Sequence, residues 1–417
     1  MNILYYLPEF LAIFAVNNII WFTPSFGNGY YFVLGVVFIL LLAQSKGKFR
    51  ISGFWFALLL ACAISILVNN VPTFFRPWLR LATFALGTAL VGPFFRGGGF
   101  CLARVRAFWM MHALLFFVCI LSFLSRLGGF GRVVGAYWCG VTTHPILLGY
   151  LVGQTLILLT YLLYRLEKLT RKRKVIIIGV ILIAFVLLLG AASRAAFLAC
   201  VVGSVVFHFL ANRGKPSRIM KGGLALLVIA SVTYSLWRPY AERMIEKNAG
   251  EITELDIASR EGVWQMLWKT FSENPILGVG FSAVDMDLGS RYVNIETGQV
   301  EVGNSWLMIL SMTGLCGGFV IVLILLRLLR CVNAQYGVNP LRTSLLAGLL
   351  VFHFFHMMAE GYVFAAGGMP FFCFWLLLGT IDAYSQLEIE KANAVEGRYI
   401  DFIQQLNLMR SGGNQVK

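Results

Sequence analysis

Blocks of about 20 mainly apolar residues recur along the whole chain, and they constrain the fold more than any other feature. One such block crosses roughly 30 Å of hydrocarbon as an α-helix, which satisfies its own backbone polar groups where no water is present. Composition agrees, because 59% of the 417 residues are hydrophobic, 13% are charged and the mean hydropathy is +0.78. These values exclude an ordinary soluble domain and predict a polytopic membrane protein.

The sequence predicts an all-α fold of about twelve transmembrane helices separated by short loops. The predicted spans are residues 7–24, 29–45, 51–70, 78–95, 107–125, 145–164, 175–192, 195–211, 222–238, 304–326, 343–360 and 364–383. The first span lacks a basic start and a small-residue cleavage site, so we expect a retained helix rather than a signal peptide.

Lysine and arginine gather in alternate loops, and this asymmetry predicts the orientation. Nineteen of the 34 basic residues lie in loops on one side of the membrane. The positive-inside rule places that side in the cytoplasm, so we expect both termini there. The net charge of +15 then reflects loops beside anionic headgroups, and no nucleic-acid partner is expected. The eight cysteines form no C-x-x-C pair, so neither a disulfide framework nor a zinc site is expected.

A long polar segment, residues 239–303, interrupts the pattern on the opposite side. It holds eleven of the nineteen acidic residues. Its stretch "SREGVWQMLWKTFSENP" predicts a helix with a bulky apolar face. We therefore expect a transmembrane domain over residues 1–383 with one large periplasmic loop of short helices at 239–303, and a cytoplasmic tail at 384–417.

Arg194 is the one charged residue in the run from Val175 to Ala211. A charge at the bilayer centre costs at least about 2.5 kcal/mol on insertion scales. The stretch "GAASR" therefore predicts a tight reversal between two spans, with Ser193 capping the second helix and Arg194 at its first position. The alternative is an arginine that only snorkels to the headgroups.

Five segments, in chain order, resemble the O-antigen ligase and O-antigen polymerase superfamily of bacterial envelope glycosyltransferases. They are "TTHPILLGYLV", "GAASRAAFLA", "SREGVWQMLWKTFSENPILGVGF", "GNSWLMILSMTGLCGG" and "AEGYVF" with "FWLLLG". The resemblance implies metal-independent, inverting transfer of a glycan from an undecaprenyl diphosphate carrier, without a cofactor, at the periplasmic face of the bacterial inner membrane. The implied partners are the undecaprenyl-diphosphate-linked glycan, the lipid bilayer, a flippase and a chain-length regulator.

The resemblance also implies a set of site residues. Arg194 and Arg260 match the family's two arginine positions, and a guanidinium fork suits a diphosphate leaving group. For Arg260 the alternative is a surface ion pair with Glu254 or Glu261. The candidate substrate-binding residues are His144, Ser193, Arg291, Asn304 and Ser305.

The chain departs from the family at one position. Ligases of this family carry a histidine directly before the asparagine of the N-S-x-L element, as the expected general base, and Gly303 stands there in this sequence. His353, His356 and Glu360 are expected on one stripe of a helix, where His356 and Glu360 are candidate catalytic residues. The alternatives are a buried pair that fixes helix packing, or a metal site. Loop carboxylates that offer the same chemistry are Asp285, Asp287 and Glu301.

Loss of the ligase histidine favours a polymerase of lipid-linked oligosaccharide repeats for exopolysaccharide, capsule or O-antigen. The alternative is a ligase that transfers the glycan to the lipid A core of lipopolysaccharide. A transporter is the alternative from another class, and it would place charged groups at mid-span within repeated halves. The candidate residues instead concentrate at one predicted face, which favours the enzyme.

Overall fold

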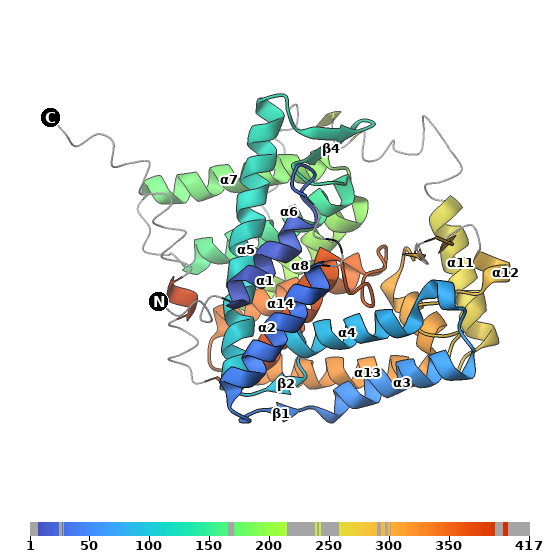
Figure 1. The fold of residues 1–417 in the computed structure, drawn as a ribbon. Helices are drawn as coiled ribbons and strands as arrows, with labels where there is room; N and C mark the ends of the chain where they lie inside the picture. The colour runs from blue at the N-terminus through green and yellow to red at the C-terminus, as the bar shows by residue number, and fades with distance from the viewer. Residues whose placement is uncertain are drawn as a thin grey trace.

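The computed structural model describes residues 7–24, 27, 29–165, 171–214, 238–239, 242, 258–289, 293–296, 299–300, 302–387 and 395–398. Within these residues the chain is mostly helical, with a few short strands (Figure 1). The expectation of an all-α class is therefore confirmed for the described residues, which are mostly helical.

Helices lie on the predicted spans that the structure describes, while the ninth, residues 222–238, falls almost wholly outside the described residues. The helices are α1 (Leu7–Asn17), α2 (Gly29–Ser45), α3 (Gly53–Val68), α4 (Pro77–Val91), α5 (Gly98–Leu127), α6 (Pro145–Arg165), α7 (Arg171–Gly190), α8 (Arg194–Ala211), α11 (Ala258–Glu273), α12 (Met286–Gly289), α13 (Ser305–Tyr336), α14 (Pro340–His356) and α15 (Met369–Tyr384), with a 3-10 turn at Thr73–Phe75. Antiparallel strand pairs are β1 (Arg50–Ile51) with β2 (Phe95–Arg96), β3 (Arg132–Val134) with β4 (Tyr137–Gly140), and β5 (Val293–Asn294) with β6 (Gln299–Val300).

Among the described helices, α5, α6, α8 and α13 are long and apolar enough to cross a membrane. Several others, including α2, α3 and α15, are apolar but shorter. The number of twelve spans and the periplasmic placement of residues 239–303 stay predictions.

The first predicted span is wrong at its end, because α1 stops at Asn17 rather than continuing to residue 24. Beyond it the backbone forms turns and meets the segment before α6 at a single bridge. Ile20 forms a bridge with Thr142, and the Trp21 amide donates to the Val141 carbonyl at 3.2 Å. These bonds replace the helical ones that residues 18–24 would otherwise make.

Helix α13 is longer than predicted and is interrupted. Gly314 has φ 60° and ψ −160°, a conformation that only glycine adopts without strain. The loop before α13 fills the break, because the amide of Leu315 donates to the Pro275 carbonyl at 2.8 Å. The Ser65 hydroxyl lies 2.6 Å from the Leu277 carbonyl oxygen and 2.7 Å from that of Met312. The break thus anchors the acidic loop segment to the helix bundle.

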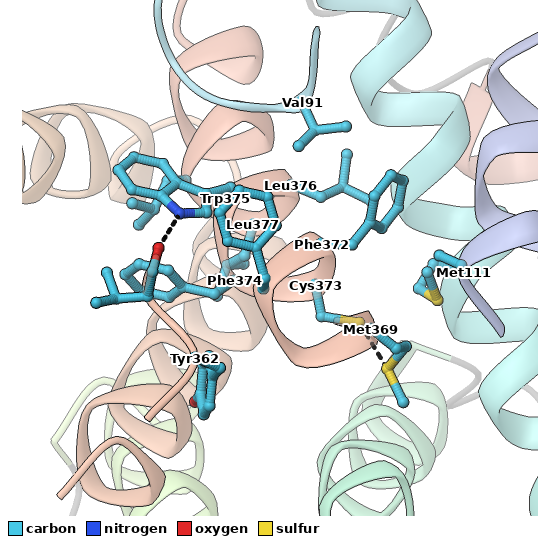
Figure 2. Close-up of a cluster of buried hydrophobic side chains, with 14 of the residues drawn as sticks. Val91, Met111, Tyr362, Met369, Phe372, Cys373, Phe374, Trp375, Leu376 and Leu377 are labelled. Atoms are coloured by element: carbon cyan, nitrogen blue, oxygen red, sulfur yellow. Dashed lines mark hydrogen bonds between the residues drawn. The ribbon is translucent and has the colours of Figure 1, made fainter. Parts of the chain in front are cut away.

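Helix α15 lies at the centre of the core. All of its residues except Pro370 are buried, as expected of a helix that is apolar on every side. Figure 2 shows Phe372, Phe374 and Trp375 pointing in different directions from this helix. The Trp375 indole donates to the Val363 carbonyl at 2.9 Å, so the one polar atom of this ring is satisfied.

Buried ion pairs join the helices at the C-terminal end of α15. Asp382 is fully buried and accepts from Arg96 at 3.0 Å, from Arg327, and from the Gln386 amide at 2.5 Å. Carboxylates are rarely buried unless they are paired in this way. The group ties β2 and α13 to α15.

The predicted tail also contacts the bundle. Val395 and Glu396 are each 1% exposed. Glu396 accepts from the Tyr161 hydroxyl and lies 3.3 Å from Arg342 Nη1 and 3.4 Å from Arg165 Nε. This part of the tail is therefore packed against the ends of α6 and α14.

Candidate functional site

The reversal between α7 and α8 confirms the expectation drawn from "GAASR". Helix α7 ends at Gly190 and α8 begins at Arg194, with Ser193 as its N-cap. The Ser193 hydroxyl accepts the Ala196 amide at 3.4 Å, and Ala192 takes a left-handed φ of 48° to complete the turn. Arg194 is exposed at the first position of the helix.

Helix α6 begins beside this reversal. A Cβ at Gly149 would lie 2.7 Å from the Ser193 Cβ, so the two backbones approach closely. His144, directly before α6, is exposed, and its Nδ1 accepts the Ile146 amide at 3.2 Å. Ser193 is 7% exposed, so His144 presents the larger surface to solvent of these two side chains.

Helix α14 ends next to the start of α6 and the reversal between α7 and α8. The His356 ring is 1% exposed, and its centroid lies 5.0 Å from that of Tyr150 on α6 and 5.7 Å from that of Tyr362. Tyr150 directly follows Gly149, which packs on Ser193. The ends of α6, α8 and α14 thus bring Arg194 and His356 to one end of the bundle.

The expected helical stripe of His353, His356 and Glu360 is wrong at its last member, because α14 ends at His356. The carbonyl of Met357 would accept the amide of residue 361 in a continuing helix, but it accepts the Ser305 amide at 2.9 Å instead. Glu360 therefore lies in a half-buried turn and not on the helix.

Ser305 joins this turn to α13. Its hydroxyl donates to the Glu360 carbonyl at 2.7 Å and accepts the Tyr362 amide at 2.9 Å. The side chain is fully buried, so its hydroxyl supports the turn from within. Asn304 is the cap of α13, and its Oδ1 accepts the amides of Trp306 at 2.9 Å and Leu307 at 3.0 Å.

The Tyr362 ring contacts both histidines, with centroid distances of 6.1 Å to His353 and 5.7 Å to His356. Its hydroxyl lies 3.2 Å from Nδ1 of His353. Burial raises the pKa of Tyr362 well above its usual value, so the phenol keeps its proton. The Tyr362 phenol is therefore a neutral hydrogen-bonding group next to the Glu360 turn.

The acidic loop reaches the site through α11. Val263, Met266 and Leu267 are buried, as predicted for the apolar face of this helix, whereas Trp264 and Trp268, predicted on the same face, are exposed. The Trp264 indole donates to the carbonyl of Gly303 at 3.0 Å. Arg260 lies one turn earlier in the same helix, and its side chain falls outside the described part of the chain.

The structure describes only some of the other sequence candidates. Arg291 and Glu301 lie outside the described residues. Asp287 is exposed on α12, and Asp285 accepts its amide at 2.9 Å. Across the described ranges, no group of three or more His, Cys, Asp or Glu side chains is placed to hold a metal ion.

Residues 178–322 match the family model described as O-Antigen ligase. The resemblance to the O-antigen ligase and polymerase superfamily is thereby confirmed. The matched region of the O-antigen ligase family includes Arg194, Arg260 and Asn304, while His144 and Glu360 lie beyond its two ends. A comparison with curated proteins finds no match.

Two aromatic residues link the elements of the candidate site, and no signal in the sequence pointed to one of them, Tyr150. Tyr150 links α6 to His356, and Trp264 links α11 to Gly303. The stretch "SREGVWQMLWKTFSENP" predicts Trp264 on the apolar face of α11, but Trp264 is exposed, and its bond to a carbonyl 39 residues away has no local signal in the sequence. The glycine spacing around Gly149 is the one sequence hint that α6 approaches α8 closely.

An open apolar groove of about 610 Å³ lies elsewhere, between α3 and α4. Alanine, leucine and aromatic side chains line it, and none of the candidate site residues does. Phe56 and Trp78 at its rim are 55% and 51% exposed. The groove belongs to the apolar outer surface of these two helices.

Proposed function

We propose that this protein polymerises undecaprenyl-diphosphate-linked oligosaccharide repeats into exopolysaccharide, capsule or O-antigen at the periplasmic face of the bacterial inner membrane. The observation that carries the proposal is the meeting of Arg194, the α13 N-terminus and the Glu360 turn at one end of the bundle, within and beside the O-antigen ligase region. Family members of this description transfer glycans, and the same activity is proposed here.

In the proposed reaction an acceptor sugar hydroxyl attacks the anomeric carbon of the donor glycan. The new C–O bond forms on the face opposite the leaving group, the bond to the diphosphate oxygen breaks, and undecaprenyl diphosphate departs. The configuration at that carbon is therefore inverted. No metal or cofactor takes part in this proposal.

The two arginines have the same proposed role. Charge develops on the diphosphate as it leaves, and guanidinium groups bind phosphate oxygens through paired hydrogen bonds. Arg194 is exposed where α8 begins, so its side chain is accessible to a headgroup in this region. Arg260 is proposed to bind the same diphosphate from α11.

We propose Glu360 as the group that takes the acceptor proton. A general base needs reach before a suitable pKa, and Glu360 is half-buried whereas His356 is 1% exposed. His356 is proposed to support the turn from within the bundle. His144, Ser193, Arg291, Asn304 and Ser305 stay candidates for holding the substrate, with Ser305 acting through the turn.

The proposed orientation has both termini in the cytoplasm. Arg165 and Arg342 lie at the ends of α6 and α14 opposite the site, and Arg96 and Arg327 pair with Asp382 near the C-terminal end of α15. This placement agrees with basic loops on the cytoplasmic side. A flippase that delivers the lipid-linked donor and a chain-length regulator are the partners this orientation allows.

A ligase is the second candidate, favoured by the description of the matching family. Gly303 replaces the histidine expected of a ligase, and its carbonyl accepts from Trp264. The test is the gel profile of lipid-linked and surface polysaccharide in a deletion strain. Single repeats in place of long chains support the polymerase, long chains retained on the carrier indicate the ligase, and an unchanged profile refutes both.

A further inference from the structure

A second charged region lies at the end of the bundle opposite the site. Arg50 on β1 and Arg96 on β2 are directly opposite each other in the two-residue ladder. Like charges in directly opposed positions destabilise a strand pair. The ladder nevertheless holds them together, so the region must tolerate or neutralise a local excess of positive charge.

Two further arginines add to this charge from inside the bundle. Arg104 is 1% exposed, and its Nε and Nη2 donate to the carbonyls of Leu90 and Ala89, each at 3.2 Å. Arg327 shares one oxygen of Asp382 with Arg96.

Asp382 does not provide acceptors for all the N–H donors of these arginines. Its second oxygen accepts the Gln386 amide at 2.5 Å. Arg96 Nε, Arg104 Nη1 and Arg327 Nη1 are buried and have no hydrogen-bond partner among the described residues. Buried donors without partners are costly. Because Asp382 is the one carboxylate that pairs with these arginines among the described residues, the group keeps an excess of positive charge that an anion at the adjacent surface would offset.

The N-terminus of α5 adds backbone donors to the same region. Gly97 is its N-cap, and no side chain caps the helix. Gly98 and Gly99 are exposed, and a Cβ at either position would meet nothing within 4 Å. An uncapped helix N-terminus with free space beside it favours a phosphoryl group. In Figure 1, β1 and β2 lie beside this lower end of α5, far from α11 and α12.

We propose that this arginine cluster, Arg50, Arg96, Arg104 and Arg327, forms a phosphoryl-binding site together with the α5 N-terminus. Arg50 and Arg96 are accessible and bind the phosphoryl oxygens together with the first amides of α5. Arg104 and Arg327 do not contact the ligand, and their positive charge inside the bundle attracts it. The ligand is the headgroup of an anionic lipid such as phosphatidylglycerol, or a free phosphate.

The test measures binding to the purified full-length protein in nanodiscs. The probes are phosphatidylglycerol in a phosphatidylcholine background, phosphatidylcholine alone and inorganic phosphate, with retained lipid measured by native mass spectrometry. The variants are Arg50→Gln, which removes an exposed side chain, and Gly98→Asp, which puts a carboxylate into the open space. The matched control is Arg330→Gln, an exposed arginine near Arg327 on α13.

We expect Arg50→Gln to lower phosphatidylglycerol retention about fivefold, the effect of one basic group near an anionic surface. Gly98→Asp is expected to lower it at least as much, and Arg330→Gln to leave it unchanged. Competition by inorganic phosphate would assign the site to a soluble anion, and its absence to a lipid headgroup. Equal effects of Arg50→Gln and Arg330→Gln, or equal retention of phosphatidylcholine, would overturn the proposal.

Discussion

Replacing Ser305 by alanine tests whether the Glu360 turn is held in place by α13. The substitution removes a hydroxyl that donates to the Glu360 carbonyl at 2.7 Å and accepts the Tyr362 amide at 2.9 Å. Tyr362 is 5% exposed, so water cannot readily replace the lost partner of its amide. A buried polar group left without a partner costs about 1–3 kcal/mol, so the buried Tyr362 amide, with a smaller share from the half-buried Glu360 carbonyl, gives about 2 kcal/mol.

A cost of about 2 kcal/mol corresponds to roughly a 30-fold change in an equilibrium constant. We therefore expect Ser305→Ala to lower glycan transfer by more than tenfold, because the turn that carries Glu360 leaves its position. The assay is glycan chain length and amount in a deletion strain that expresses the variant, normalised to membrane-inserted protein.

Ser311→Ala is the matched control on the same helix. Its hydroxyl is also fully buried, but it donates to the Met308 carbonyl of its own helix at 3.3 Å. We expect near wild-type transfer from this variant. Wild-type transfer by Ser305→Ala at normal protein levels would refute the proposed role of the turn.

Two further substitutions test the anchors of the fold by thermal unfolding in detergent. Gly314→Ala forces a side chain into a glycine-only conformation against the Ile276 backbone and is expected to cost about 3 kcal/mol or more, while Gly318→Ala on the same helix should stay within about 1 kcal/mol. Equal melting temperatures for these two variants would contradict the described break. Glu396→Gln is expected to cost about 3 kcal/mol because it removes the carboxylate charge from the buried ion pair with Arg342, against less than about 1 kcal/mol for Glu273→Gln in an exposed pair. Equal losses would show that the tail does not pack as described.

Local signals in the sequence were enough to predict the start of α8. The capping serine, the small residues before it and the cost of a charge at the bilayer centre all act within a few residues of Arg194. The apolar face of α11 was predicted for the same reason, since periodicity is a local property.

The end of α14 and the break in α13 could not be predicted in this way. The helical pattern continues through Glu360, but Ser305, 55 residues away, takes the bonds that would extend it. Gly314 reads as an ordinary glycine in an apolar helix, and only the loop around Pro275 makes its conformation necessary. The pairing of Asp382 with Arg96 likewise depends on contacts across the whole bundle.

The most direct test of the proposed function uses purified protein in liposomes with undecaprenyl-diphosphate-linked repeat units. The variants are Arg194→Ala, at the start of α8, and Arg213→Gln, at the exposed opposite end of the same helix. We expect long glycans from the wild type and from Arg213→Gln, and a loss of about 100-fold or more from Arg194→Ala. Equal chain growth by Arg194→Ala and the wild type would contradict this expectation.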